Sequence, residues 1–155
     1  MKGIARLRPG VFPDASSMAC VHNTQGNAMF AIRSITVDCA DPYRQALFWN
    51  EITGWPEDPE DPNHPDDPEG RIVSPHGISL LFIPVPEGKV VKNRMHLDLM
   101  PTACRRDEEV ARQLAVGARM VEDHREPDGS GWVTLADPEG NEFCVERSDA
   151  ERRQG

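Results

Sequence analysis

The sequence has few basic residues, few aromatic residues and no long apolar run. Its 155 residues include 17 Lys and Arg against 26 Asp and Glu, which gives a formal net charge of −9. Nucleic-acid binding depends on clustered basic side chains, so this balance argues against a nucleic-acid partner, although it permits attraction of a cationic small molecule. No segment approaches the roughly 18 apolar residues of a transmembrane helix. We therefore expect a soluble protein that binds neither nucleic acid nor membrane.

The cysteines are also sparse, and none is arranged in a CxxC pair. They are Cys20, Cys39, Cys104 and Cys144. Cysteines at such spacing are typical of reduced thiols in a cytosolic protein. The first residues include Pro9, Gly10 and Pro13, where a secretory signal would need an apolar stretch. The expected location is the cytoplasm.

The domain organisation follows from where regular patterning begins and ends. Residues 1–28 have no sustained helix or strand period and predict an irregular N-terminal extension. Residues 29–148 predict a single domain, and residues 149–155 a charged tail. Within the domain, residues 57–69 place a proline at every third position among acidic residues, which is typical of a solvated loop. The sequence indicates no role for the extension or for this loop.

Three landmarks recur at an offset of 62 to 63 residues, which indicates two copies of one small module. The pairs are the strand-like runs Ser34–Asp38 and His96–Met100, the glycines Gly54 and Gly117, and the turn glycines Gly77 and Gly140. Module one spans about 29–86 and module two about 92–148. The repeat places the expected site at the seam between the modules.

Each module is predicted to follow the order β-α-β-β-β. In module one, residues 34–38 alternate like a half-buried strand, and Asp41-Pro42 is typical of a helix start, with Gly54 ending the helix. A hairpin is expected at 71–74 and 78–83. The second strand of this module, expected between residues 55 and 70, is not assigned, because the prolines there cannot donate to a strand ladder. The strands predicted for module two are 95–100, 119–124, 132–136 and 142–146, with a helix at 107–116.

These residues resemble the vicinal oxygen chelate superfamily and, within it, the glyoxalase-like domains. The matching landmarks are Ala40-Asp41-Pro42, Phe48-Trp49, Gly54-Trp55, the run Asn93 to Leu99 and, most specifically, Leu135 to Phe143 with its DPEGN turn. The resemblance covers about residues 30–147. It implies an α+β fold of two βαβββ modules whose mixed sheets curl around a cleft, the glyoxalase/bleomycin resistance/dioxygenase fold, commonly in a homodimer.

The resemblance also implies a metal site, which this sequence does not complete. Members that bind a divalent metal take ligands, typically His, Gln or Glu, from the first and last strands of each module. In this sequence the four corresponding positions are Ser34, Leu81, His96 and Cys144, and only His96 is one of these ligand types. Because metal affinity depends on the number and type of ligands, we expect no metal, no other cofactor and no glyoxalase I activity.

The candidate site consists of polar side chains that share strand faces. His96 and Asp98 are the expected catalytic pair, because a histidine beside a carboxylate can move a proton. The expected ligand-binding residues are Ser34, Thr36, Asp38, Arg94, Trp132, Glu142 and Cys144. An equally weighted alternative is that His96 only satisfies Asp98 or Asp38 within the sheet.

Two classes of function remain open at this stage. The first is a small-molecule enzyme that uses acid/base chemistry without a metal. The second is a protein that sequesters a ligand, as the antibiotic-sequestering members of the superfamily do. A metal-dependent lyase, isomerase or dioxygenase ranks third, and fold alone does not choose between the three or name the ligand.

Overall fold

The fold is made of seven strands and three helices among residues 31–154, which are the residues that the computed structural model describes. The predicted extension 1–28, with Cys20, lies outside them. The first module contains β1 (Ser34–Cys39), α1 (Pro42–Thr53), β2 (Gly70–Val73) and β3 (Ser79–Pro84). The second contains β4 (Asp98–Leu99), α2 (Arg106–Ala115), β5 (Arg119–Asp123), β6 (Val133–Ala136) and β7 (Glu142–Val145), and α3 (Asp149–Arg152) follows. None of the described helices is long and apolar enough to cross a membrane.

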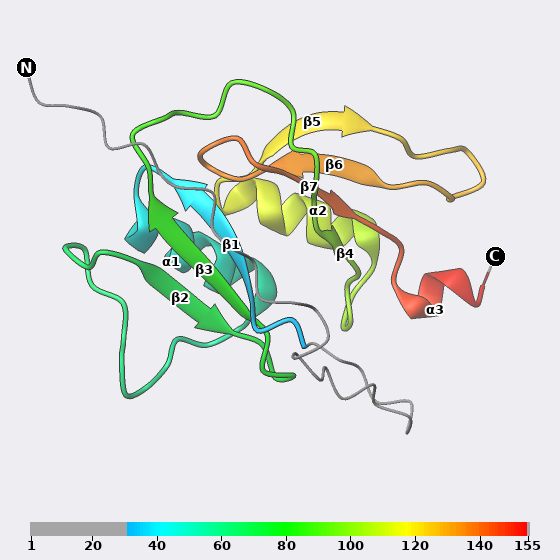
Figure 1. Ribbon diagram of the computed structural model, residues 1–155. Coiled ribbons are helices and arrows are strands. Elements are labelled where there is room, and N and C mark those ends of the chain that lie inside the picture. The colour runs from blue at the N-terminus through cyan, green and yellow to red at the C-terminus, as the bar shows by residue number, and fades with distance from the viewer. Residues whose placement is uncertain (1–30, 155) are drawn as a thin grey trace, which may run out of the picture. The chain divides into compact units, whose positions relative to one another are not determined.

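Each module builds its own mixed sheet, and Figure 1 shows the two sheets as separate groups of strands. The first sheet has the order β1-β3-β2 and the second the order β4-β7-β6-β5. In both, the first strand of the module runs parallel to its last strand, and the other pairs are antiparallel. The expected α+β class with two repeated modules is therefore confirmed.

The first module has one strand fewer than the second. Between α1 and β2 only an isolated bridge forms, between Asp58 and Asp61. The Asn63 carboxamide takes over part of the missing strand: its Oδ1 accepts from the Arg71 amide at 2.7 Å, and its Nδ2 donates to the Arg71 carbonyl at 3.0 Å. The proline-rich loop thus covers an edge of β2 that would otherwise offer unpaired backbone groups.

The helix boundaries follow local signals that the sequence already contained. The Asp41 side chain accepts a hydrogen bond from the Arg44 amide at 3.0 Å, so it caps α1 as predicted. Gly54 ends α1 with φ of 68°, a left-handed conformation that favours glycine. Its repeat partner Gly117 follows α2 with φ of 114°. The repeat of these landmarks therefore reflects a repeat of backbone conformation.

Strand β4 is shorter than the predicted strand 95–100. Only Asp98 and Leu99 belong to the ladder, although Leu97 still accepts a hydrogen bond from the Cys144 amide at 2.8 Å. Met95 is 85% exposed. Because β4 is an edge strand with β7 as its single neighbour, backbone pairing does not hold the residues before Leu97.

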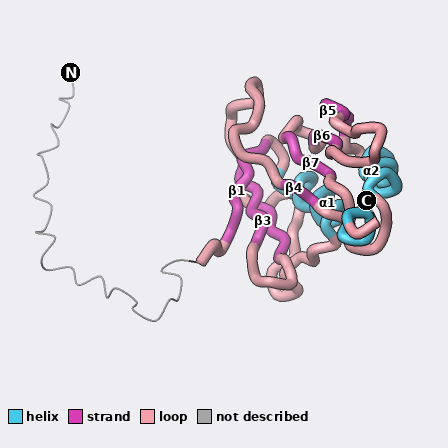
Figure 2. The backbone as a smooth tube through the Cα atoms, turned by 90° about the vertical axis from the view of Figure 1, so that its right-hand side faces the viewer, coloured by secondary structure: helices cyan, strands magenta, loops and turns pink. Residues whose placement is uncertain are grey.

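A shared core joins the two modules on the helix-covered faces of the sheets. The Trp49 ring on α1 packs against Phe143 on β7 with ring centroids 5.1 Å apart. The buried apolar residues of both modules form one cluster that includes Ile72, Leu80, Phe82, Val133, Leu135 and Val145. Figure 2 shows α1 beside the layer of β1 and β3. The polar faces of the strands are left outside this core.

The DPEGN turn after β6 fastens the second module to α1. The Asp137 carboxylate is fully buried and accepts from the Trp49 indole at 3.3 Å. It also accepts from the amides of Glu139 and Asn141 and from the Asn141 side chain. The Glu139 carboxylate in turn accepts from the amides of Ala40 and Asp41 at the start of α1. The turn that carried the family resemblance is thus a cross-module contact.

We expect Asp137→Ala to lower the free energy of unfolding by about 3 kcal/mol, because it leaves the buried Trp49 indole and three partly buried N–H donors of the turn without an acceptor. Urea unfolding followed by far-UV circular dichroism measures this loss. Asp66→Ala, an exposed change in the proline-rich loop, is the control and should stay within about 0.5 kcal/mol of wild type. Equal stabilities for the two variants would contradict the role given to Asp137.

Candidate functional site

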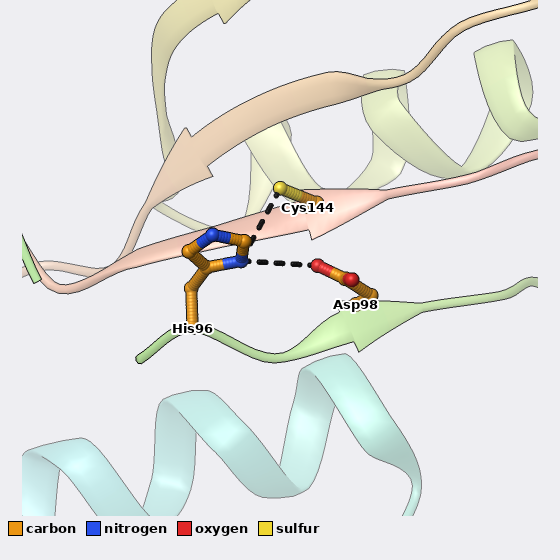
Figure 3. Close-up of side chains that lie close together, drawn as sticks. All are labelled: His96, Asp98 and Cys144. Atoms are coloured by element: carbon orange, nitrogen blue, oxygen red, sulfur yellow. Dashed lines mark hydrogen bonds and ion pairs between the residues drawn. The ribbon is translucent and has the colours of Figure 1, made fainter. Parts of the chain in front are cut away.

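Three side chains with reactive groups converge on the open face of the second sheet. His96 Nδ1 lies 3.0 Å from Asp98 Oδ1 and 3.7 Å from Cys144 Sγ. Figure 3 shows the imidazole and the carboxylate rising from the β4 segment toward Cys144 on the neighbouring strand. Among residues 31–154 they are the one group of three or more His, Cys, Asp or Glu side chains whose donor atoms all lie within 4.8 Å of one another.

Strand register explains why these residues meet. Asp98 pairs with Cys144, Cys144 with Thr134, and Thr134 with Glu122, so one row crosses all four strands. Because strand side chains alternate between faces, His96 shares the face of Asp98. Phe143 and Val145, the neighbours of Cys144 in sequence, point into the core instead. The site therefore occupies the face that the helices do not cover.

A cavity of about 300 Å³ lies above this row. It is lined by Lys92, His96, Asp98, Glu122, His124, Trp132, Thr134, Glu142, Cys144 and Glu146. All of these residues belong to the second module. The side chains of His96 and Asp98 are 39% and 53% exposed, so the pair is accessible to a ligand rather than enclosed within the sheet.

Cys144 is a neutral thiol in this environment. Burial raises the pKa of its thiol, and the Asp98 carboxylate adds to the rise, while Thr134 opposes it. In a relay of the Cys-His-Asp kind, one ring nitrogen faces the carboxylate and the other faces the sulfur. Here the same atom, His96 Nδ1, faces both groups. Cys144 is therefore placed as part of the cavity floor and not as an activated nucleophile.

Glu142 is held ionised at one side of the cavity. Although burial alone would raise it, the pKa of Glu142 is lowered by the Asn93 amide and the Lys89 ammonium. Lys89 Nζ lies 2.9 Å from Glu142 Oε2, and the Asn93 amide donates to the same oxygen at 2.9 Å. These contacts tie the segment before β4 to β7.

The divalent metal site of the superfamily does not fit these residues. Leu81, one of the four positions carried across, has no donor atom, and Ser34 offers only a neutral hydroxyl. Both lie in the first sheet and neither lines the cavity beside His96. His96, Asp98 and Cys144 could hold an ion as a different set, since their donor atoms lie within 4.8 Å of one another.

The structure brings together five of the nine predicted site residues and separates the other four. His96, Asp98, Trp132, Glu142 and Cys144 line one cavity. Ser34, Thr36 and Asp38 lie exposed on β1 in the other sheet, and Arg94 is exposed but does not line the cavity. This cavity therefore does not lie at the predicted seam between the two modules. Asp98, and not Asp38, is the partner of His96.

Sequence reasoning missed five of the cavity residues, which are Lys92, Glu122, His124, Thr134 and Glu146. Alternation could have grouped Thr134 with Trp132 and His124 with Glu122, because each pair is two residues apart. Placing both pairs beside Cys144 requires the register of β5 and β7 on β6. That register includes an irregularity between Met120 and Glu122, which alternation does not reveal.

The comparison with known proteins agrees with this architecture. A sequence profile of the glyoxalase-like domain matches residues 34–146. The chain belongs to the glyoxalase-like domain family. The resemblance to the vicinal oxygen chelate superfamily is thereby confirmed over both modules. No curated protein matches the sequence.

Several solved structures share the fold at low sequence identity. A glyoxalase/bleomycin resistance protein/dioxygenase family enzyme from Burkholderia phytofirmans is 16% identical over 75% of this chain and 97% of its own, with a TM-score of 0.58. A mutant fosfomycin resistance protein, FosX, from Listeria monocytogenes, in complex with Mn(II) and 1S,2S-dihydroxypropylphosphonic acid, is 15% identical over 82% and 96%, with 0.59. TioX from Micromonospora is 17% identical over 76% and 98%, with 0.51. At identities of 15 to 17%, these comparisons show a shared fold alone.

Proposed function

We propose that this glyoxalase-like protein binds a small organic molecule in the cavity above β4, β7, β6 and β5 and transfers a proton through His96. The observation that supports this most directly is the accessible His96–Asp98 pair, 3.0 Å apart at the cavity wall. An imidazole side chain can accept and release a proton in the physiological pH range. A carboxylate partner fixes which ring nitrogen does so.

The hydrogen bond defines the chemistry available to the imidazole. An ionised Asp98 can only accept, so the contact at Nδ1 requires a proton on Nδ1. In the neutral ring the lone pair then lies on Nε2, which is the atom that would take a proton from a bound substrate. Asp98 would stabilise the imidazolium formed in this step. Asp98 is thus the positioning residue and His96 the general base.

The alternative function is sequestration of a ligand without turnover, as in a bleomycin-resistance-like protein. The exposed Trp132 beside the cavity favours this reading, because a large aromatic surface binds ligands without requiring chemistry. Mass spectrometry of a bound ligand before and after incubation separates the two functions. An unchanged ligand supports sequestration, and a converted one supports catalysis.

We expect His96→Ala to leave stability within about 1 kcal/mol of wild type, because the pair with Asp98 is exposed, and to abolish turnover of any ligand found in a small-molecule library. Urea unfolding measures the stability. Thermal shift against the library identifies the ligand, and mass spectrometry of that ligand before and after incubation measures its turnover. His76→Ala, in an exposed turn, is the control and should change neither. A stability loss of roughly 3 kcal/mol would assign His96 a structural role instead.

We also propose that the protein works without a divalent metal and lacks glyoxalase I activity, because Leu81 and Ser34 replace expected ligands. Protein purified without chelator should contain less than stoichiometric Ni, Zn, Fe or Mn by elemental analysis. A methylglyoxal and thiol adduct should show no turnover. Stoichiometric metal that is lost in Asp98→Ala or Cys144→Ala would instead assign the His96 cluster as a metal site.

Homodimerisation is a further part of the proposal. β1, β4 and β5 are edge strands of their sheets, and exposed strand edges favour pairing or coverage by another chain. Light scattering at micromolar concentration should give about twice the chain mass of 17.3 kDa. A constant monomer mass over this range would contradict the dimer.

A further inference from the structure

Trp132 and His124 form an aromatic pair at one end of the cavity. Their rings stack with centroids 4.5 Å apart and an angle of 28° between planes. The pairing of β5 with β6 continues through them, since the His124 amide donates to the Trp132 carbonyl at 3.0 Å. Trp132 nevertheless remains 43% exposed. A large aromatic surface that is not covered by the protein is suited to stacking on a planar ligand.

The loop that joins these two residues is held in one conformation. The Arg106 guanidinium, on a residue only 4% exposed, donates to the carbonyls of Gly129, Ser130 and Gly131 at 3.3, 3.2 and 2.9 Å. A Cβ added at Gly131 would lie 1.9 Å from the His124 carbonyl oxygen, so the two strands approach as only glycine allows. The aromatic pair is therefore preorganised, which lowers the entropy lost on binding.

The charges around the cavity favour a cation near this pair. Glu142 is neutralised by Lys89, and Glu146 by Arg152. The ion-pair partners of Asp98 and Glu122 are imidazoles, those of His96 and His124, which carry no charge unless protonated. Lys92 is the one basic lining residue besides the histidines. The cavity lining thus has two carboxylates without a permanently charged partner, Asp98 and Glu122, and one ammonium, that of Lys92. A site with this negative excess attracts a positive ligand.

We propose that the ligand of this cavity carries a planar, positively charged ring that stacks on Trp132 beside Glu122, while its reacting end reaches His96. The inference rests on the proposed function, because it assumes that the His96 cavity is the binding site. Asp98 and Glu122 are three strand spacings apart in one row, which is roughly 14 Å. The anchor and the proton-transfer group can therefore engage opposite ends of one drug-sized molecule. Cation–π attraction to Trp132 adds to the charge of Glu122.

Isothermal titration with three probes tests the charge and the ring separately. N-methylquinolinium is a planar cation, naphthalene-1-sulfonate is an anion with two fused rings of the same size, and tetramethylammonium is a cation without a ring. We expect N-methylquinolinium to bind at least tenfold more tightly than either of the others in 50 mM salt. Its advantage over the sulfonate should shrink in 0.5 M NaCl, because salt screens the carboxylates.

Matched variants locate the binding. Trp132→Ala should weaken N-methylquinolinium binding about tenfold through lost stacking, and Glu122→Gln about threefold through lost charge. The controls are Leu47→Ala, whose side chain is 42% exposed on α1, and Glu60→Gln in the proline-rich loop, and both should bind like wild type.

Three results would overturn this ligand class: equal or tighter binding of the sulfonate, no binding of N-methylquinolinium at millimolar concentration, or binding unaffected by Trp132→Ala. None of them bears on the His96→Ala experiment, which uses a library of all charge types. A neutral or anionic library ligand whose turnover depends on His96 would leave the proposed function intact. It would contradict only the proposal that the ligand carries a cationic ring.

Discussion

The buried carboxylate of Asp137 is the contact on which the rest of the structure depends. It sits in the turn between β6 and β7 and satisfies donors from that turn and from Trp49 on α1. A buried carboxylate is tolerated only when several hydrogen bonds replace its lost hydration. One of these donors, the Trp49 indole, reaches Asp137 only when the two modules are together. This makes the association of the modules specific as well as apolar.

Joining the modules through their helix-covered faces decides which strand faces can form the cavity. Trp49 and Phe143 are buried at the join, so the alternate residues of β7, among them Cys144, turn to the open face. His96 and Asp98 reach the same face from β4, which is held to β7 by backbone hydrogen bonds from Cys144 and Glu146. The core and the cavity are thus two faces of one sheet, and a shift of β7 by one residue would exchange them.

The open face combines two regions of different character. At one end His96 and Asp98 form an accessible acid/base pair, and at the other Trp132 and His124 form a rigid aromatic surface. The neutral thiol of Cys144 lies between them. In the function proposed above, the rigid hairpin end would bind the ligand and the edge-strand end would transfer the proton. This division is compatible with a protein that binds tightly and with one that also turns its ligand over.

Local signals in the sequence were sufficient for the repeated modules and for most element boundaries. Asp41 caps α1 and Gly54 ends it through contacts within a few residues, so both helix boundaries can be predicted without knowledge of the fold. His96 and Asp98 could be paired for the same reason, because they are two residues apart in the sequence. Their joining with Cys144, Trp132 and Glu122, and the separation of Ser34, Thr36 and Asp38 into another sheet, depend on which strands are neighbours. Strand order and register are set by burial of the whole core, so only the tertiary structure could decide them.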